Sequence, residues 1–137
     1  MNHDALAYAS LSISGDAVLP EFWTRYFSVE PDISITKDSP FSTPFGVSGK
    51  RRTGVWSVSS KAAVQSDLLD QHLRYLIRHL GLPRQDLRDL VHQSGAKMRF
   101  FCYWLNDKED RTPEIAEDIR ELMSSLGGTI DIDGYRF

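Results

Sequence analysis

The segment Lys97–Leu105 constrains the fold more than any other part of the sequence, because it is apolar on both sides of an extended chain. Successive side chains of a β-strand point to opposite faces. Large apolar residues occupy both sets of positions here: Met98, Phe100, Cys102 and Trp104 on one side, Phe101, Tyr103 and Leu105 on the other. This pattern is typical of a central strand that is covered on both faces. We therefore expect a layered fold built on a sheet that contains this strand.

Strand and helix periodicities recur in the rest of the chain. Four further segments have strand patterns: Leu6–Ser14, Ile33–Thr36, Val55–Ser59 and Thr129–Asp133. Four apolar stripes predict helices that begin at Pro20, after Ser66 or Asp67, at Pro83 and at Thr112-Pro113. The predicted order is β-α-β-β-α-(α)-β-α-β. Its first six main elements match a ferredoxin-like β-α-β-β-α-β sandwich, so we expect an α+β fold with a mainly antiparallel sheet, helices on one face and an appended α-β unit.

The length suits a single domain that spans residues 1–137. The longest uninterrupted apolar run, Phe100–Leu105, is far shorter than the roughly 20 residues of a membrane-spanning helix. Residues Met1–Asp4 lack the basic and apolar parts of a secretory signal, and the single cysteine, Cys102, excludes an internal disulfide framework. We expect a soluble cytoplasmic domain with no membrane partner.

Charge is distributed unevenly along the chain. The net charge of −3 argues against nucleic-acid binding, which usually requires a basic surplus. Between Lys37 and Lys61, however, five basic residues stand against one acidic residue, whereas nine acidic residues stand against four basic ones from Asp107 to Phe137. This asymmetry suits a charged partner or attraction between two copies, although a solvated loop and a solvated helix surface have the same composition.

The least regular stretch is Lys37–Gly54, which is rich in proline, glycine, serine and threonine and has no periodicity. A stretch of this length without secondary structure is usually a binding loop or a mobile one. We expect irregular backbone that crosses the edge or the uncovered face of the sheet. At least one of Phe41 and Phe45 should pack on the domain, because polar contacts alone do not offset the entropy of ordering a loop. The basic run Lys50-Arg51-Arg52 should stay exposed as a candidate anion contact.

Two acidic residues of the last predicted strand form a candidate site. Alternation places Asp131 and Asp133 on one face, roughly 6.5–7 Å apart. Such a pair could hold a cation or act in acid–base catalysis, but no third ligand is placed beside it, and any half-solvated strand has the same pattern. We predict no metal and no cofactor.

The histidine and cysteine residues do not form a recognisable site. His72 and His79 lie two helical turns apart, roughly 10 Å, which is too far to share an ion, and they border the apolar stripe as partly buried side chains would. Cys102 lies in the most apolar strand, where a buried and unreactive thiol is expected.

One face of the predicted sheet, here called the open face, has no helix to cover it. Alternation collects on it Tyr8, Ser10, Ser12, Ser57, Arg99, Phe101, Tyr103, Asp131 and Asp133. Its centre is too apolar for idle surface and its edges are too polar for a second core. We expect Phe101 and Tyr103 to be covered by the 37–54 stretch, by a second subunit or by a ligand.

Several short motifs together resemble a known family. They are Tyr8-x-x-Leu11-x-Ile13, Phe27-Ser28-Val29-Glu30-Pro31, the loop that runs to Trp56, and Leu126-Gly127 followed by Ile130-Asp131-Ile132-Asp133. Their order and spacing resemble the bacterial family called domain of unknown function 4279 over nearly the whole chain, although Gly134 intervenes before Tyr135 where the family closes on an aspartate and an aromatic residue. The resemblance implies a compact α+β domain of bacterial origin, and it implies no catalytic residue and no substrate.

These observations favour a non-enzymatic binding domain. The candidate partner-binding residues are Tyr8, Lys50, Arg51, Arg52, Arg99, Phe101, Tyr103, Asp131 and Asp133. The expected partner is another protein or a second copy of the chain, as in a homodimer. Two alternatives stay open: a small-molecule or metal-dependent enzyme built on Asp131, Asp133 and the basic loop, and a single-stranded nucleic-acid binder with Phe101 and Tyr103 as stacking platforms.

Overall fold

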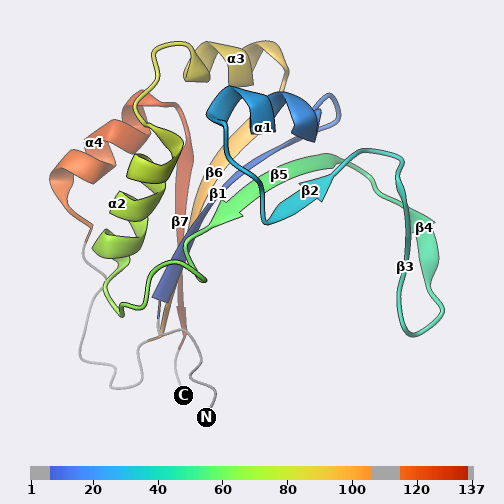
Figure 1. The fold of residues 1–137 in the computed structure, drawn as a ribbon, viewed down its shortest axis with the longest axis horizontal. Helices are drawn as coiled ribbons and strands as arrows, with labels where there is room; N and C mark the ends of the chain where they lie inside the picture. Colours follow the sequence, from blue (N-terminus) through green and yellow to red (C-terminus); the bar gives the residue numbers. More distant parts are fainter. Residues whose placement is uncertain (1–6, 106–114, 136–137) are drawn as a thin grey trace.

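The computed structural model describes residues 7–105 and 115–135 and has an α+β fold (Figure 1). Within these residues it contains four helices, a five-stranded mixed sheet and a two-stranded sheet. The elements in chain order are β1 (Ala7–Gly15), α1 (Pro20–Phe27), β2 (Ile33–Ile35), β3 (Pro40–Ser42), β4 (Ser48–Lys50), β5 (Gly54–Ser59), α2 (Leu69–Leu80), α3 (Leu87–Gln93), β6 (Lys97–Leu105), α4 (Glu117–Ser125) and β7 (Thr129–Tyr135). None of the helices in the described residues is long and apolar enough to cross a membrane.

The main sheet has the strand order β2-β5-β1-β6-β7. The pairs β2–β5, β5–β1 and β1–β6 are antiparallel, and β6 and β7 run parallel. A parallel neighbour needs a crossover connection, and α4 lies in the connection between these two strands. The expectation of a mainly antiparallel sheet is confirmed for this part of the chain.

All four helices join one hydrophobic core on a single face of the sheet. On β1 the odd-numbered side chains from Ala7 to Ile13 are buried and the even-numbered ones are half-buried, as the alternation predicts. Of the residues that the helix stripes place in the core, Leu73, Leu76 and Ile119 are fully or almost fully buried. Leu122 is only half-buried, and the side chain of Trp104 lies outside the described residues.

Two expectations about the main sheet need correction. Strand β6 is not covered by helices on both sides, because Phe101 and Tyr103 are half-buried on the face opposite the helices. On β7, the alternation that places Asp131 and Asp133 on the open face predicts an inward Ile132. Ile132 has that register beside Cys102 but is 37% exposed, since β7 is the last strand of the sheet and has a neighbour on one side only.

Helix ends follow local rules in part. Pro20 is the first residue of α1, and Gly81 ends α2 in the left-handed conformation with φ +65°, which a glycine adopts without strain. Pro83, in contrast, does not begin a helix: α3 begins at Leu87, because the buried Leu82 and the Arg84 side chain tie the intervening loop to the body. The predicted start at Thr112-Pro113 lies outside the described residues, and α4 is seen from Glu117.

The stretch predicted to be irregular is instead a hairpin, here called the hairpin arm (residues 37–52). Strands β3 and β4 pair antiparallel, and the arm projects beyond the β2 edge of the sheet (Figure 1). The Phe41 ring is covered from within the arm, by Gly49 and by the Arg51 guanidinium 4.7 Å from the ring centre. Of the two phenylalanines expected to anchor this stretch, Phe45 is 92% exposed, whereas Phe41 is half-buried through these contacts within the arm. Cross-strand pairing orders the segment locally and removes the need for that anchor.

Candidate interaction site on the open face

Strand register gathers most of the predicted site on the open face. Tyr8 lies opposite Tyr103, Ser10 opposite Phe101 and Ser12 opposite Arg99. On the other side of β6, Asp131 lies beside Phe101 and Asp133 beside Tyr103 in the register, the Asp133 side chain being outside the described residues. Residues from both ends of the sequence thus form one surface, because β1 and β7 flank the same strand.

Three aromatic rings form the centre of this surface. Tyr8 and Tyr103 stack with their centroids 5.0 Å apart and an interplanar angle of 17°. Tyr8 also lies 6.2 Å from Phe101 at an angle of 46°. All three side chains are half-buried. Offset and tilted ring pairs at these distances attract one another, so each ring shields part of its neighbour from water.

Two cations lie against these rings. The guanidinium carbon of Arg99 is 5.0 Å from the centre of Phe101, and the Lys61 ammonium nitrogen is 5.5 Å from the centre of Tyr8. Arg99 Nε also donates to Asp131 Oδ2 at 2.5 Å, with both side chains about half exposed. The charge of Arg99 is therefore balanced on the face itself, and that of Asp131 is too.

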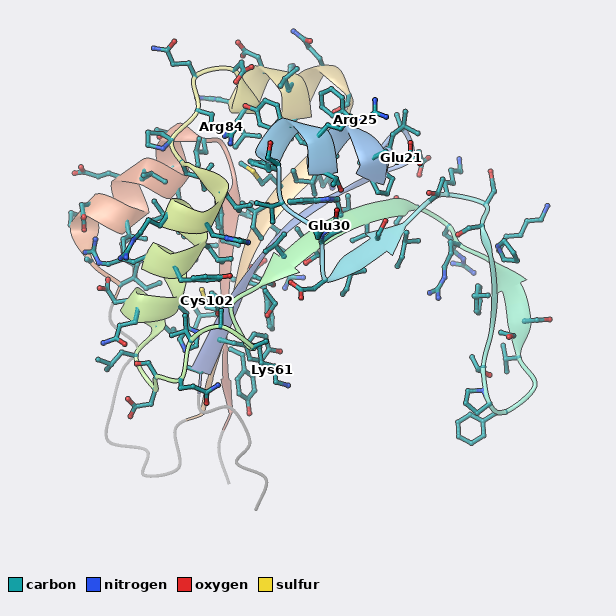
Figure 2. All side chains as sticks on the ribbon, viewed as in Figure 1. Glu21, Arg25, Glu30, Lys61, Arg84 and Cys102 are labelled. Atoms are coloured by element: carbon teal, nitrogen blue, oxygen red, sulfur yellow. The ribbon has the colours of Figure 1, made fainter. Side chains whose placement is uncertain are left out.

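Lys61 is a member of the site that the sequence analysis missed. It follows β5, whose residue Ser59 pairs with Ser10, so continuing the antiparallel register by two residues on each side brings Lys61 toward Tyr8. Figure 2 shows Lys61 at that end of the sheet. The position of Lys61 just after β5 is visible in the sequence, but its place beside Tyr8 follows only from the pairing of β5 with β1.

Hydroxyl groups continue the face toward β5. Ser12 and Ser57 share a hydrogen bond with their oxygens 2.9 Å apart, and Ser57 is buried. Asp32 accepts a hydrogen bond from the Ser59 backbone N–H at 2.7 Å. These polar groups are hydrogen-bonded within the domain, and they form a short polar margin beside the rings.

The basic run is not part of this surface. Lys50 is the last residue of β4, and Lys50, Arg51 and Arg52 are all exposed, as predicted, but on the hairpin arm. The candidate residues therefore fall into two groups, one on the open face and one on the arm (Figure 1). Local charge patterning could not show this, because the separation depends on where the hairpin leaves the sheet.

A metal centre finds no support in the geometry of the acidic pair. Asp131 is engaged by Arg99, an arrangement that suits a cross-strand tie rather than cation binding. Among the residues that the structure describes, no group of three or more His, Cys, Asp or Glu side chains is placed to hold an ion.

Comparison with known proteins places the chain in a family. The model of the family described as Domain of unknown function (DUF4279) matches residues 5–136, which includes every strand of the open face and the hairpin arm. The chain belongs to this family. No curated protein sequence and no solved structure matches it. The match confirms the family that the sequence motifs indicated, and the family description assigns no activity.

A buried serine–histidine pair in this DUF4279 domain resembles catalytic machinery but has no access to solvent. His72 Nδ1 lies 2.7 Å from Ser60 Oγ, and both residues are fully buried. His72 Nε2 is 2.7 Å from the Ser66 carbonyl, which can only accept, so Nε2 carries the proton and Nδ1 accepts the serine hydroxyl. Ser60 Oγ in turn accepts from the Ala9 N–H at 2.9 Å. The group fastens α2 to β1 and β5, and no substrate can reach it.

The histidines and the cysteine of the DUF4279 domain differ in how well they were predicted. His72 is fully buried and His79 is exposed, stacked on Tyr75 at 5.1 Å, so the expectation of two partly buried histidines is wrong for both. Cys102, labelled in Figure 2, is buried in β6, as expected, and burial raises the pKa of its thiol to about 11. A thiol that stays protonated is a poor nucleophile, so Cys102 is a core residue.

Proposed function

We propose that this chain is a non-enzymatic interaction domain that binds protein through its open face. The observation that carries the proposal is the cluster of the Tyr8, Phe101 and Tyr103 rings on the sheet face opposite the four described helices. Aromatic side chains supply large contact area at a low cost in side-chain entropy, and they dominate the binding energy of protein interfaces. A partner that covers these rings would remove half-exposed apolar surface from water.

The charges around the rings favour a protein partner. Arg99 and Asp131 balance one another within the face, so the surface offers both signs of charge around an apolar centre. Protein interfaces have this composition, an apolar centre within a polar margin that includes arginine. A second copy of the chain would meet the same pattern, because Arg99 of one copy could pair with Asp131 of the other across a two-fold axis.

The two alternatives receive less support from the geometry. Nucleic-acid binding needs a row of cations beside the stacking rings. Of the two cations at the rings, Arg99 is paired with Asp131 and leaves Lys61, while Lys50, Arg51 and Arg52 lie out on the arm. The enzyme hypothesis needs Asp131 to be available as a base or ligand, and its carboxylate is held by Arg99 instead.

We further propose that strands β2, β5, β1 and β6 form a ferredoxin-like arrangement, to which α4 and β7 are appended. Support comes from their order and from their antiparallel pairing. An arrangement of this kind has its helices on one face, which leaves the other for binding. A cytoplasmic location is part of the same proposal, because the one cysteine is a buried free thiol, as is usual in a reducing compartment.

Phe101→Glu tests the proposal, because a charge is tolerated on a wet surface and costly in an apolar interface. The matched control is Gln71→Glu, which adds the same charge on the exposed side of α2. Mass is measured by light scattering, and bound proteins are quantified by mass spectrometry after affinity enrichment from native cells. We expect Phe101→Glu to lose a partner, either a second copy or another protein, that Gln71→Glu retains. Identical masses and identical bound proteins for both variants would contradict the proposal.

A further inference from the structure

The tip of the hairpin arm is an ordered turn. The Thr43 N–H donates to the Val47 carbonyl at 2.7 Å, and the Gly46 N–H donates to the Thr43 carbonyl at 3.1 Å. The Val47 N–H also donates to Thr43 Oγ1 at 3.2 Å. Gly46 has φ +83°, a conformation that side chains other than glycine rarely adopt. This turn holds Phe45 in place at the end of the arm.

The tip exposes apolar side chains to an unusual degree. Phe45 is 92% exposed and Val47 is 57% exposed. An aromatic side chain on an ordered turn has lost part of its freedom before binding, so inserting it into a pocket costs less than inserting a mobile one. The arm therefore has the properties of an anchor.

A groove of matching character lies between α1 and α3. It has a volume of about 290 Å³, and its apolar lining includes Leu19, Phe22, Trp23 and Leu90. Leu19 and Phe22 are 62% and 46% exposed, and they are the exposed large apolar residues of this end of the molecule. The opening suits the insertion of a single aromatic side chain.

Polar contacts fix the position of the α1 wall relative to α3. The Tyr26 hydroxyl donates to Asp86 Oδ1 at 2.5 Å, immediately before α3. The Arg84 guanidinium lies 4.8 Å from the Tyr26 ring centre, and Arg84 Nη1 donates to the Tyr26 carbonyl at 2.8 Å. Figure 2 shows Arg84 between the end of α2 and α1. The groove is thus preformed.

The arm and the groove carry opposite charges at their margins. Residues 37–52 contain Lys37, Lys50, Arg51 and Arg52 against Asp38, a net charge of +3. Because the whole chain has a net charge of −3, the residues outside the arm have a net charge of −6. Glu21 is exposed between Leu19 and Phe22, and the exposed Asp89 adjoins Leu90, while Arg25 lies on the next turn of α1. A basic arm is attracted to such a body over a distance set by the ionic strength.

The arm cannot fill the groove of its own molecule. Its tip points away from the end of the sheet that α1 and α3 cover (Figure 1). We propose that Phe45 at the arm tip of one copy docks in the α1–α3 groove of a second copy. This contact is separate from the open face, and two copies can form it mutually or in a chain.

The test measures mass by sedimentation velocity from low concentration up to about 300 µM, because one aromatic anchor gives weak association. We expect the unmodified chain to associate with rising concentration and to dissociate as salt is added. Phe45→Glu and Phe22→Glu should each shift the equilibrium to monomer, at least tenfold in dissociation constant. Leu68→Glu is the matched control, since Leu68 is 53% exposed and lies outside both surfaces. Circular dichroism verifies that each variant is folded.

Mixing the two variants is the decisive measurement. Phe45→Glu keeps an intact groove and Phe22→Glu keeps an intact arm, so the mixture should form a one-to-one complex that neither forms alone. An unmodified chain that stays monomeric, or a mixture that forms no complex, overturns the inference. Binding of phosphatidylserine vesicles that Phe45→Glu abolishes and Phe22→Glu retains would assign the arm to membranes instead. If Phe101→Glu alone removes the association, the inference fails and the proposed function stands.

Discussion

The two faces of the main sheet are built on the same strands and differ in what covers them. On the covered face Leu11, Ile13 and Phe100 have no exposed surface, and helices seal them from water. On the open face Tyr8, Phe101 and Tyr103 alternate with these residues and stay half-buried, with Tyr8 in contact with both other rings. The comparison teaches that alternation along one strand assigns one set of side chains to the core, while the set between them stays partly exposed and forms the surface proposed here for binding. Substitutions on the two faces should therefore have different consequences.

The largest effect is expected at the centre of the covered face. Leu76→Ala removes a fully buried side chain of α2 and leaves a cavity, which typically lowers the free energy of unfolding by 2–5 kcal/mol. Urea denaturation measures the loss. Leu68→Ala is the control, because this leucine is 53% exposed and its truncation leaves no cavity. A loss below about 1 kcal/mol for Leu76→Ala would show that α2 does not seal this face.

Alkaline pH should lower the free energy of unfolding, because Cys102 is buried on the covered face. Burial raises the pKa of the thiol to about 11 from the ordinary value of 9.0. Below pH 9 the thiol is protonated in both states and its contribution is constant. Between pH 9 and 11 it ionises first in the unfolded chain, so stability falls, by about 2–3 kcal/mol if this pKa difference acts alone.

Comparison with Cys102→Ala isolates that contribution. The pKa of Tyr26 is raised to about 12 by burial and by its hydrogen bond to Asp86, so it adds a loss of its own between pH 10 and 12 in both proteins. Unfolding free energies are measured at intervals from pH 7 to 11. Equal pH dependence of the two proteins would mean that the folded state lets the thiol ionise freely.

A smaller loss is expected at the buried hydrogen-bond group. Ser60→Ala leaves the Ala9 N–H and His72 Nδ1 without their hydroxyl partner, at a cost of about 1–3 kcal/mol. Ser10→Ala on the open face should change stability by no more than about 0.5 kcal/mol. Thermal and urea unfolding of Ser60→Ala and Ser10→Ala compare the same chemical change at a buried and a half-buried position. Equal losses of stability would contradict the expected difference between the two faces.

At the site itself, stability should change far less than binding. Phe101→Glu loses a ring contact with Tyr8 and a cation contact with Arg99, worth about 1 kcal/mol together on a half-exposed face. Binding should be lost while the urea midpoint shifts much less than it does for Leu76→Ala. A destabilisation as large as that of Leu76→Ala would show that Phe101 belongs to a core and not to an interaction surface.

Local patterns predicted most of the covered face because they report on single elements. The alternation in β1, the stripe of α2 and the end of α2 at Gly81 each depend on residues close in the chain. The same reasoning failed in residues 37–52, where proline, glycine and serine indicated irregular backbone and cross-strand hydrogen bonds formed a hairpin instead. It also misjudged His72, whose burial depends on Ser60 and on the Ser66 carbonyl.

The sequence by itself determined which side chains of each strand share a face, the α+β class and the family, since periodicity and motif order are properties of the chain. Tertiary structure alone decided that β6 lies between β1 and β7, which stacks Tyr103 on Tyr8 and sets Asp131 against Arg99. It also brought Lys61 to the rings and carried the basic run away from them on the arm. The physical reason is that neighbouring strands are chosen by packing and register over the whole sheet, and no local pattern records that choice.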